Sequence, residues 1–417
     1  MHFFNYKKGN LFAEDVSVAE IVERIGTPVY IYSYKTLLRH FKAYENAFQR
    51  IPHIICFALK ANSNSAIIRL LAKNGCGADV VSGGELYRAI RAGVDPKKIV
   101  YAGVGKTESE IRYALKNKIL MFNVESDNEL LEMDRIAGTM GVKAPVALRV
   151  NPDIDPQTHP YISTGLKQHK FGIPIENALE FYGLASSLKN IKVVGVHKHI
   201  GSQITSIKPF VDAIKRILLF IDSLIRQGIS IQYLDIGGGL GITYKDENPP
   251  LPSQLAKSIL PLISKHNLTL IAEPGRSIVG NAGILVTKVL YLKKSANKIF
   301  VIVDAGMNDL IRPSIYGAYH NIQPVAKKNR TKITADIVGP ICESGDFLAK
   351  DRQISVVRQG EYLAVMSAGA YGYSMSSNYN SRPRPAEVLV RDGNFALIHK
   401  RETYSDLLRG EKIPEFI

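Results

Sequence analysis

The sequence predicts a closed parallel (β/α)8 barrel followed by a mostly antiparallel β domain. Between about Ile54 and Gly275, eight short apolar runs rich in β-branched residues alternate with segments of helical spacing. Several of those segments open on helix-capping residues, and after Gly283 apolar runs follow one another with little helix between them. Strands that helices cover on both sides read as continuous apolar runs, as these do. An open, doubly wound sheet is the competing fold.

The eight runs are short enough for strands, and each ends in a polar or glycine-rich turn. In chain order they are IICFALK, ADVVS, IVYAG, LMFNVES, VALRVNP, VVGVHKHIGS, YLDIGGG and LTLIAEPG.

The helices between the runs are predicted from spacing and from capping residues. Apolar residues from Ile207 to Ile225 keep the i, i+3, i+4 spacing of one helix face, and Gly228 follows as a stop signal. In three other helices a hydroxyl residue precedes a glutamate by three positions, so the hydroxyl can cap a backbone N–H while the carboxylate reaches back. The three pairs are Ser82 with Glu85, Thr107 with Glu110, and Ser126 with Glu129.

The second domain is predicted from the runs after Gly283, which turns punctuate. We place the barrel at residues 35–280 and the β domain at 1–34 and 281–417, since FFNY and PVYIYSY near the start can add strands to it. The later runs are ILVTKVLYLKK, KIFVIVDAG, ITADIVG, EYLAVMSAG, AEVLVRDG and FALIHK.

Composition narrows the class of protein. The 417 residues are 46% hydrophobic, enough for more than one domain, but no apolar run approaches the ~20 residues of a membrane-spanning helix. We expect no membrane association and, without a signal-peptide pattern, a cytoplasmic location. Cys56, Cys76 and Cys342 are too few and scattered for a disulfide framework or a metal site. The net charge of +15 is spread along the chain, which favours anionic small molecules over nucleic acid.

In a (β/α)8 barrel the chemistry gathers at the carboxyl ends of the strands. A lysine at such an end has an ordinary explanation, since most lysines lie at the surface. Taken together, however, the residues at the carboxyl ends of the predicted strands form an unusual set. They are Lys60, Ser82, Gly103, Glu125, Arg149 with Asn151, His197 with His199, Gly237 to Gly239, and Glu273 with Gly275 and Arg276.

This set of side chains suits one cofactor. The GGG and EPGR runs offer backbone N–H groups to a phosphate. A desolvated lysine near other cations becomes a nucleophile for aldehydes. Together with an imidazole that can stack and a carboxylate that can keep a ring nitrogen protonated, these groups fit pyridoxal 5'-phosphate.

The motifs also resemble those of a known family. FALKAN, HKHIGSQ, GGGLG, EPGR, CESGD and AGAYG, with DAGMNDLIRPSIYGAYH and YNSRPRPAEVL, are similar to the diaminopimelate decarboxylases, which are barrel-type pyridoxal phosphate decarboxylases related to alanine racemase. The similarity runs from about Tyr30 to the last strands. It implies a TIM-like barrel, a homodimer with shared active sites, and decarboxylation of meso-2,6-diaminopimelate to L-lysine and CO2, the last step of lysine biosynthesis.

The resemblance assigns the cofactor contacts. It implies that Lys60 forms the internal Schiff base, that His199 stacks on the pyridine ring, and that Glu273 bonds the pyridinium nitrogen. Outside this family, His199 reads as a core histidine and Glu273 as a surface carboxylate. Tyr371 reaches the phosphate or the substrate, while Asp79 and Arg149 are weaker candidates for supporting the lysine and the ring. The residues expected around the phosphate are Ser202, Gly238, Gly239, Gly275 and Arg276, of which Arg276 also lies near the substrate.

The resemblance also assigns the substrate contacts. Cys342 matches the family's proton donor, on a loop from the neighbouring subunit, whereas an isolated cysteine is otherwise a buried, inert thiol. Arg312 can grip a carboxylate bidentately, with Tyr316 and Glu343 near the distal carboxylate and ammonium. An amine-ended substrate leaves a buried arginine unpaired, which costs ~1–3 kcal/mol or more.

Alternatives remain open at this point. On the same scaffold they are a decarboxylase of ornithine, arginine or carboxynorspermidine, and outside catalysis a silent cofactor carrier or a nucleic-acid binder. Lys198 stands between the two histidines where relatives often carry an uncharged residue; either it points away from the cofactor and is harmless, or it slightly weakens the assignment of His197. The stretch from Asn151 to Gly172 is either a mobile lid or an ordered long loop.

Overall fold

The computed structural model describes residues 2–154 and 170–417. Most of the stretch between Asn151 and Gly172, interpreted above as a lid or a long loop, falls on residues 155–169 and so lies outside the described residues. The chain divides into two compact units, which we call the β unit and the barrel unit. The β unit comprises residues 1–37, 244–246 and 279–417, and the barrel unit comprises residues 38–243 and 247–278.

The barrel unit is a closed ring of eight parallel strands. Neighbours in the chain are neighbours in the ring, and the last strand pairs with the first, with Ile271 opposite Ile54. The closed barrel is therefore confirmed, and the open doubly wound sheet is excluded. The strands are β5 (His53–Ala58), β6 (Gly77–Val80), β7 (Ile99–Tyr101), β8 (Met121–Val124), β9 (Ala144–Asn151), β11 (Ile191–His197), β12 (Tyr233–Asp235) and β13 (Thr269–Ala272), with the two-residue β10 (Ile173–Pro174) beside β9.

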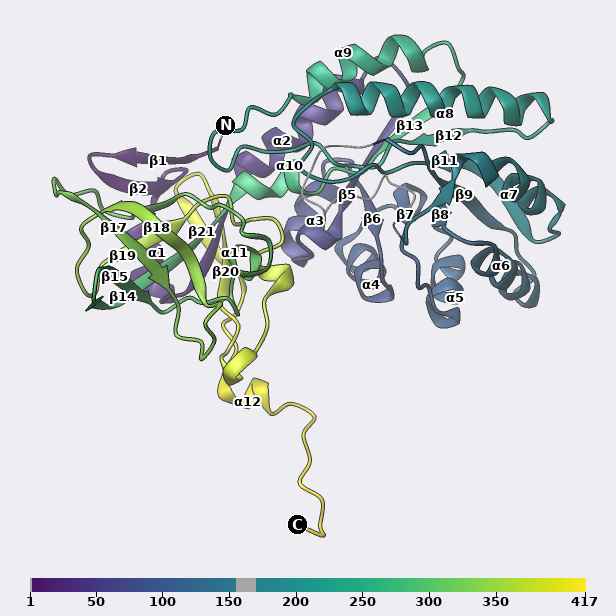
Figure 1. Ribbon diagram of the computed structural model, residues 1–417. Helices are drawn as coiled ribbons and strands as arrows, with labels where there is room; N and C mark the ends of the chain where they lie inside the picture. Colours follow the sequence, from purple (N-terminus) through teal and green to yellow (C-terminus); the bar gives the residue numbers. More distant parts are fainter. Residues whose placement is uncertain (1, 155–169) are drawn as a thin grey trace. The chain divides into compact units, whose positions relative to one another are not determined.

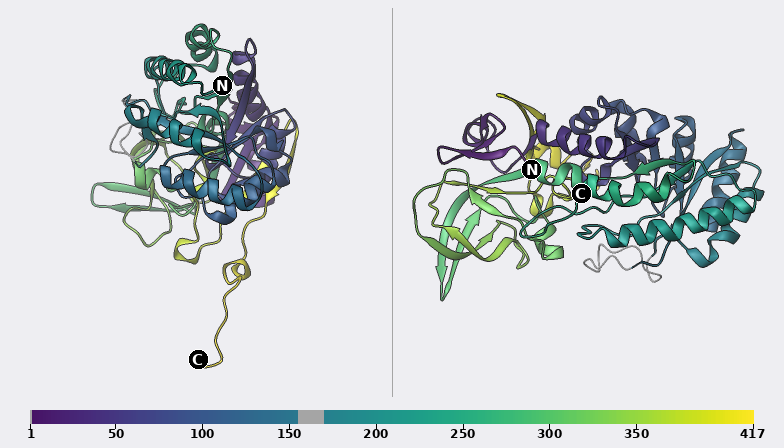
Figure 2. Two further views of the ribbon diagram at one scale, coloured as in Figure 1. Left: turned by 90° about the vertical axis from the view of Figure 1, so that its right-hand side faces the viewer. Right: turned by 90° about the horizontal axis from the view of Figure 1, so that it is seen from above.

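Helices surround this ring, so that each strand is covered on its outer side (Figure 1). Helices α8 and α9 lie side by side along one flank of the ring, in teal and green in Figure 2. Within residues 2–154 and 170–417, every helix is too short or too polar to cross a bilayer. The helices of the ring are α2 (Tyr34–Phe48), α3 (Ser65–Ala72), α4 (Gly83–Ala92), α5 (Glu108–Lys116), α6 (Asp127–Thr139), α7 (Ile175–Ser187), α8 (Lys208–Arg226), α9 (Pro252–Ile263) and α10 (Arg276–Val279).

The three helix starts expected from hydroxyl residues are confirmed. Thr107 forms a complete capping box with the glutamate three residues later. At Ser82 and Ser126 the hydroxyl also accepts the expected N–H, at 3.2 Å in both cases. There the carboxylates of Glu85 and Glu129 accept from the residue before the cap, at 2.8 and 2.9 Å, which ties each helix to the end of the preceding strand.

The β unit holds a mixed sheet of mostly antiparallel strands. Its central strand, β14, pairs antiparallel with β4, β15 and β19, whereas β15 with β17 and β4 with β20 run parallel because long connections separate them along the chain. Strands β16 and β18 were not expected from the sequence. The strands of this sheet are β4 (Val29–Ser33), β14 (Gly283–Ser295), β15 (Lys298–Val303), β16 (Ile322–Pro324), β17 (Lys332–Val338), β18 (Phe347–Ser355), β19 (Tyr362–Val365), β20 (Ala386–Arg391) and β21 (Asn394–His399).

Two smaller parts complete the β unit. A three-stranded sheet of β1 (Phe4–Lys7), β2 (Asn10–Ala13) and β3 (Val16–Ser17) leads into α1 (Val18–Ile25). A single core joins these N-terminal elements to β4, β14 and β20, and it includes Leu11, Ile21 and Ile31, all fully buried. Sequence-distant segments thus share one hydrophobic core. The short helices α11 (Arg312–Tyr316) and α12 (Tyr404–Leu407) also belong to this unit.

Candidate active site

Lys60 lies directly after β5, in the single helical turn Leu59–Ala61. Its ammonium donates a hydrogen bond to Oδ2 of Asp79 at 2.5 Å, and 39% of its side chain is exposed. Lys60 is therefore neither a free surface lysine nor an inaccessible one. It is an amine that a charge partner holds at the carboxyl edge of the ring.

Asp79 projects from β6, the strand next to β5, and is fully buried. Burial, and to a smaller extent the nearby Glu273, raise the pKa of its carboxyl to about 7, although Lys60 acts in the opposite direction. Asp79 can thus exchange a proton near neutral pH while it holds the amine of Lys60 in place.

Glu273 follows β13, on the other side of β5, and belongs to a buried polar group inside the ring. The side-chain ligand atoms of His197, Asp235 and Glu273 all lie within 4.8 Å of one another. Nε2 of His197 is 3.5 Å from Oε2 of Glu273. The Nδ2 amide of Asn123 lies 3.3 Å from both Oδ2 of Asp235 and Oε1 of Glu273, so it bridges the two carboxyls. Asp235 and Asn123 were not expected from the sequence to take part.

The carboxyls of Asp235 and Glu273 share one proton, and their surroundings decide which of the two carries it. Burial raises the pKa of Asp235 well above its ordinary value, and the adjacent Glu273 raises it further. Burial also opposes ionisation of Glu273, but His197, Lys60 and a hydrogen bond from Asp235 outweigh it and hold the pKa of Glu273 below its usual range. Two adjacent carboxyls in a dry interior cannot both ionise. Asp235 therefore keeps the proton, and Glu273 is the carboxylate.

His199 lies just past the end of β11 and is neutral. Burial lowers its pKa well below the ordinary value, and the positive charges of Arg149 and Lys60 lower it further. The backbone N–H of Gly238 donates to Nδ1 of His199 at 3.3 Å, so the ring hydrogen of the neutral form lies on Nε2. His199 is thus an uncharged imidazole with a fixed orientation.

The turn after β12 consists of glycines because it has no space for side chains. A Cβ on Gly238 would lie 2.4 Å from the carbonyl oxygen of Glu273, and one on Gly239, where φ is +112°, would lie 2.4 Å from that of Gly201. Gly275 approaches the segment that carries Lys60, since a Cβ there would lie 3.0 Å from Cβ of Ala61. These glycines bring the ends of β12, β13 and β5 together and form a cradle lined with backbone.

Two arginines lie at the same edge of the ring. Nη2 of Arg276, at the start of α10, donates to Oγ of Ser202 at 3.1 Å. Nη1 of Arg149 donates to both oxygens of Glu125, at 3.2 and 3.3 Å, so this arginine is engaged in a buried ion pair. Arg276 and Ser202 thus place a guanidinium and a hydroxyl side by side, and their predicted contact with a phosphate stays a prediction.

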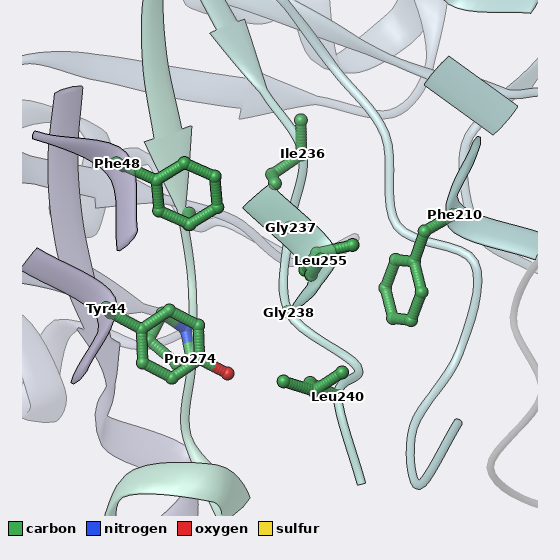
Figure 3. Close-up of a pocket in the computed structure, with 10 residues that line it drawn as sticks. Tyr44, Phe48, Phe210, Ile236, Gly237, Gly238, Leu240, Leu255 and Pro274 are labelled. Atoms are coloured by element: carbon green, nitrogen blue, oxygen red, sulfur yellow. The ribbon is translucent and has the colours of Figure 1, made fainter. Parts of the chain in front are cut away.

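A small apolar pocket lies behind the glycine turn. Figure 3 shows Tyr44 and Phe48 of α2, Phe210 of α8 and Leu240 grouped around Gly237 and Gly238. The lining residues that the structure describes carry no charged side chain. This pocket packs the outer side of the turn and does not suit a phosphate.

Lys198 points away from the ring interior and is fully buried. Its Nζ lies 5.4 Å from the centre of the Phe210 ring, and burial lowers its pKa to about 7. The amine of Lys198 thus faces an aromatic ring of α8, whereas Nε2 of His197 faces Glu273.

The remaining predicted residues belong to the β unit. Cys342 is exposed on a turn after β17, and its backbone N–H donates to Oδ1 of Asn380 at 2.7 Å. The buried carboxylate of Asp346 accepts from the N–H groups of Ile341 and Met307, both at 2.6 Å, which holds the turn in shape. The reading of Cys342 as a buried thiol is therefore wrong. Glu343 is exposed on the same turn.

Arg312 and Tyr316 are the first and last residues of α11, and the first is buried while the second is half-buried. The hydroxyl of Ser314 on this helix donates to the carbonyl of Gly345 at 2.6 Å, which connects α11 to the turn of Cys342. Tyr371 is half-buried, and its φ of +55° is unusual for a bulky residue, a form of strain that often marks functional positions.

The barrel unit thus provides the groups that pyridoxal phosphate requires. An amine and an ionised carboxylate follow the neighbouring strands β5 and β13 of one ring, a neutral imidazole follows β11, and a backbone cradle with Arg276 adjoins them. The donor set fits an aldehyde, a ring nitrogen and a phosphate. Among the described residues, none of the side chains discussed at this edge of the barrel is unsuited to pyridoxal phosphate.

Replacing Asp235 with Asn tests the position of the proton. A buried carboxyl with a raised native pKa destabilises the fold progressively as the pH rises above its unfolded pKa of about 4. The amide of Asn imitates the protonated acid and does not titrate. We expect the free energy of unfolding of Asp235→Asn, relative to that of the unsubstituted protein, to be more favourable at pH 8 than at pH 5, by at most about 1.4 kcal/mol per pH unit.

Urea denaturation of the cofactor-free protein at both pH values measures this difference. Asp246→Asn is the control, since that side chain is 84% exposed. A variant that instead loses more stability at pH 8 than at pH 5 would show that Asp235 is ionised in the native protein.

Comparison with known proteins agrees with this site. Residues 34–280 match the family described as "Pyridoxal-dependent decarboxylase, pyridoxal binding domain". The chain is 55% identical over 403 residues to a diaminopimelate decarboxylase of Aquifex aeolicus, covering 96% of each chain.

Solved structures give the same result. The crystal structure of diaminopimelate decarboxylase from Helicobacter pylori complexed with L-lysine is 45% identical, with a TM-score of 0.91, and the match covers 94% of this chain and 98% of that one. The corresponding structure from M. jannaschii, also with L-lysine, is 42% identical, with a TM-score of 0.95 and coverage of 99% and 98%. The chain belongs to the pyridoxal-dependent decarboxylases and, within them, to the diaminopimelate decarboxylase family.

Proposed function

We propose that this protein uses pyridoxal 5'-phosphate to decarboxylate meso-2,6-diaminopimelate, giving L-lysine and CO2. The observation that carries the proposal is the arrangement at the closure of the ring. The amine of Lys60 and the ionised Glu273 follow the adjacent strands β5 and β13, with a neutral imidazole beside them. Relatives that carry the name diaminopimelate decarboxylase over nearly the whole chain support the choice of reaction.

The residues of the ring hold the cofactor. When bound, pyridoxal phosphate supplies an electron sink for the bond that breaks at the substrate carbon. Nζ of Lys60 attaches it, and the carboxylate of Glu273 keeps a proton on the ring nitrogen. His199, neutral and oriented by Gly238, packs against the ring.

The phosphate binds at the glycine turns. Backbone N–H groups there have no side chain in the way, and a guanidinium beside a hydroxyl adds a fixed positive charge and a donor. Asp79 holds Lys60 in place and exchanges a proton near neutral pH. The residues proposed for the phosphate are Ser202, Gly238, Gly239, Gly275, Arg276 and Tyr371.

The β unit selects the substrate. Arg312 pairs with the carboxylate at the end that does not react, and Tyr316 and Glu343 contact the same end of the molecule. A buried guanidinium left without a carboxylate costs ~1–3 kcal/mol or more, which disfavours ornithine and other amine-ended substrates. Arg276 and Tyr371 also contact the substrate.

After CO2 leaves, the substrate carbon takes a proton from Sγ of Cys342. The thiol is exposed on a turn that Asp346 holds in shape, so it can be presented in a fixed direction. We assign this cysteine to the partner's active site, which makes the functional unit a homodimer. Residues 35–280 then form the cofactor domain, with 1–34 and 281–417 forming the β domain, and the cytoplasmic location stays a prediction.

The attachment residue can be identified directly. Borohydride reduction of the holoenzyme, which makes the link between lysine and cofactor permanent, followed by peptide mapping should place the cofactor on Lys60. Lys60→Ala should lose both the cofactor absorbance and activity, whereas Cys342→Ala should keep the absorbance and lose most of the turnover, since one general acid contributes roughly 10²- to 10⁴-fold. A yellow, normally active Lys60→Ala protein would refute the assignment.

The substrate can be identified by measuring CO2 release from several amino acids. We expect release from meso-diaminopimelate and little from ornithine, arginine or carboxynorspermidine, because these lack the second carboxylate or place other groups there. Arg312→Met should reduce this preference by roughly 10- to 100-fold, since it removes a charged hydrogen bond. Comparable turnover of ornithine with none of meso-diaminopimelate would replace the proposed reaction by another decarboxylation.

Mixing two inactive variants tests the shared site. In a mixture of Lys60→Ala and Cys342→Ala, heterodimers contain one site with both residues intact if the cysteine acts across subunits. Random exchange makes about half of the dimers mixed, so roughly a quarter of the original activity should return. If each site is built within one subunit, no activity returns on mixing.

A further inference from the structure

The guanidinium of Arg312 is held from two sides by residues of its own unit. Nη1 lies 2.8 Å from Nε2 of His320. Its Cζ lies 4.7 Å from the centre of the Tyr244 ring, in the short stretch 244–246 that groups with the β unit. Neither His320 nor Tyr244 stood out in the sequence.

The position of His320 is set by strand pairing. In the antiparallel pair of β16 with β19, Ile322 is opposite Val365, so the residues just outside this pair also lie side by side. The N–H of Met366 donates to the carbonyl of Asn321 at 2.8 Å. The carbonyl of Met366 in turn lies 2.9 Å from Nδ1 of His320. Both ring nitrogens of this fully buried histidine are therefore engaged by fixed partners.

These two partners determine the protonation of His320. A guanidinium is always charged and can only donate, so Nε2 must accept. A backbone carbonyl can only accept, so Nδ1 must carry the hydrogen. His320 is thus the neutral Nδ1–H tautomer, because an imidazolium would direct an N–H at the N–H of Arg312.

Tyr244 contacts the guanidinium from a second side. Its face lies over Cζ of Arg312, and its ring meets the ring of His320 at 81° with centroids 5.3 Å apart. The five N–H donors of arginine share one plane in a rigid fork. Engaging one donor and packing a ring against the group therefore restricts the directions of the other donors.

We propose that His320, braced by Tyr244, is a positioning residue that orients the guanidinium of Arg312 for a substrate carboxylate and so contributes to substrate selection. This inference rests on the proposed function, in which Arg312 binds the distal carboxylate. The ligand class is an amino acid with a carboxylate at the end that does not react. L-Lysine carries that carboxylate, and 1,5-diaminopentane is the same molecule without it.

Two substitutions separate positioning from simple packing. His320→Phe keeps a ring of similar size but removes the acceptor, whereas the amide oxygen of His320→Gln can still accept from Arg312. The control is His399→Phe, an exposed histidine of the same unit. Each holoenzyme is assayed for kcat and KM with meso-diaminopimelate, and for inhibition by L-lysine and by 1,5-diaminopentane.

We expect His320→Phe to raise KM and to weaken inhibition by L-lysine, each by roughly 10- to 100-fold, because an arginine that is not oriented forms poorer charged hydrogen bonds. The kcat should fall less than KM rises. Inhibition by 1,5-diaminopentane should stay within about threefold, and His320→Gln should recover most of the loss. The His399→Phe control should match the unsubstituted enzyme.

Several results would overturn the inference: unchanged KM and L-lysine inhibition in His320→Phe, equal losses for both inhibitors, or no recovery in His320→Gln. A measurement on the unsubstituted enzyme covers the case in which His320→Phe does not fold. Nitrogen-15 NMR at pH 7.5 should show His320 as neutral, with its hydrogen on Nδ1, and a charged ring or the other tautomer would contradict the proposal.

Failure of the inference can be told apart from failure of the proposed function. If the unsubstituted enzyme neither decarboxylates meso-diaminopimelate nor is inhibited by L-lysine, the proposed function is wrong, and the inference falls with it. If it does both and the His320 variants behave like it, only the inference is wrong.

Discussion

The pairing of β13 with β5 is the contact on which the rest of the site depends. It closes the ring, and it places the carboxyl end of the last strand next to that of the first. Glu273 and Lys60 follow these two ends, although more than half of the chain separates them. Gly275 permits the close approach, since a Cβ there would press on Ala61. A carboxylate and an amine are thus brought to one place by hydrogen bonds between backbones.

The electrostatics of the ring interior follow from burial. Four polar side chains, those of Asn123, His197, Asp235 and Glu273, are buried inside the ring, where only a limited charge can be kept. Asp235 retains a proton, and Asn123 bridges the two carboxyls, which leaves Glu273 as the ionised member. That distribution suits a cofactor with a protonated ring nitrogen. The protonated acid next to it acts as a hydrogen-bond donor that holds the carboxylate in position.

The β unit contributes in a different way, through turns and helix ends rather than strand ends. Asp346 holds the turn of Cys342, and Ser314 connects that turn to α11, where Arg312 begins the helix. In the proposed reaction this unit supplies the proton and recognises the unreacted end of the substrate. Hydrogen bonds to backbone groups hold these segments, and buried bonds of this kind fix side chains more closely than exposed ion pairs do.

Much of the architecture could be predicted from the sequence because its signals are local. The eight apolar runs, the capping residues at Ser82, Thr107 and Ser126, and the helix ending before Gly228 were all visible in short windows, and the structure has each of them. Lys60 and Glu273 stood out because a charged side chain ends an apolar run. The short strand β16 and the strand β18 lacked such a signal, since alternation in them is brief or interrupted by charges.

What the tertiary structure alone decided is the state of each group, because protonation and orientation depend on neighbours that are distant in the chain. Asp235 reads as an ordinary residue before a glycine turn, and its proton follows only from the proximity of Glu273 inside the ring. His320 and Tyr244 lie 76 positions apart and become relevant only where both meet Arg312. The sequence by itself determined which chemical groups are available at the strand ends. The fold determined their charges and directions, because burial and close contact set both.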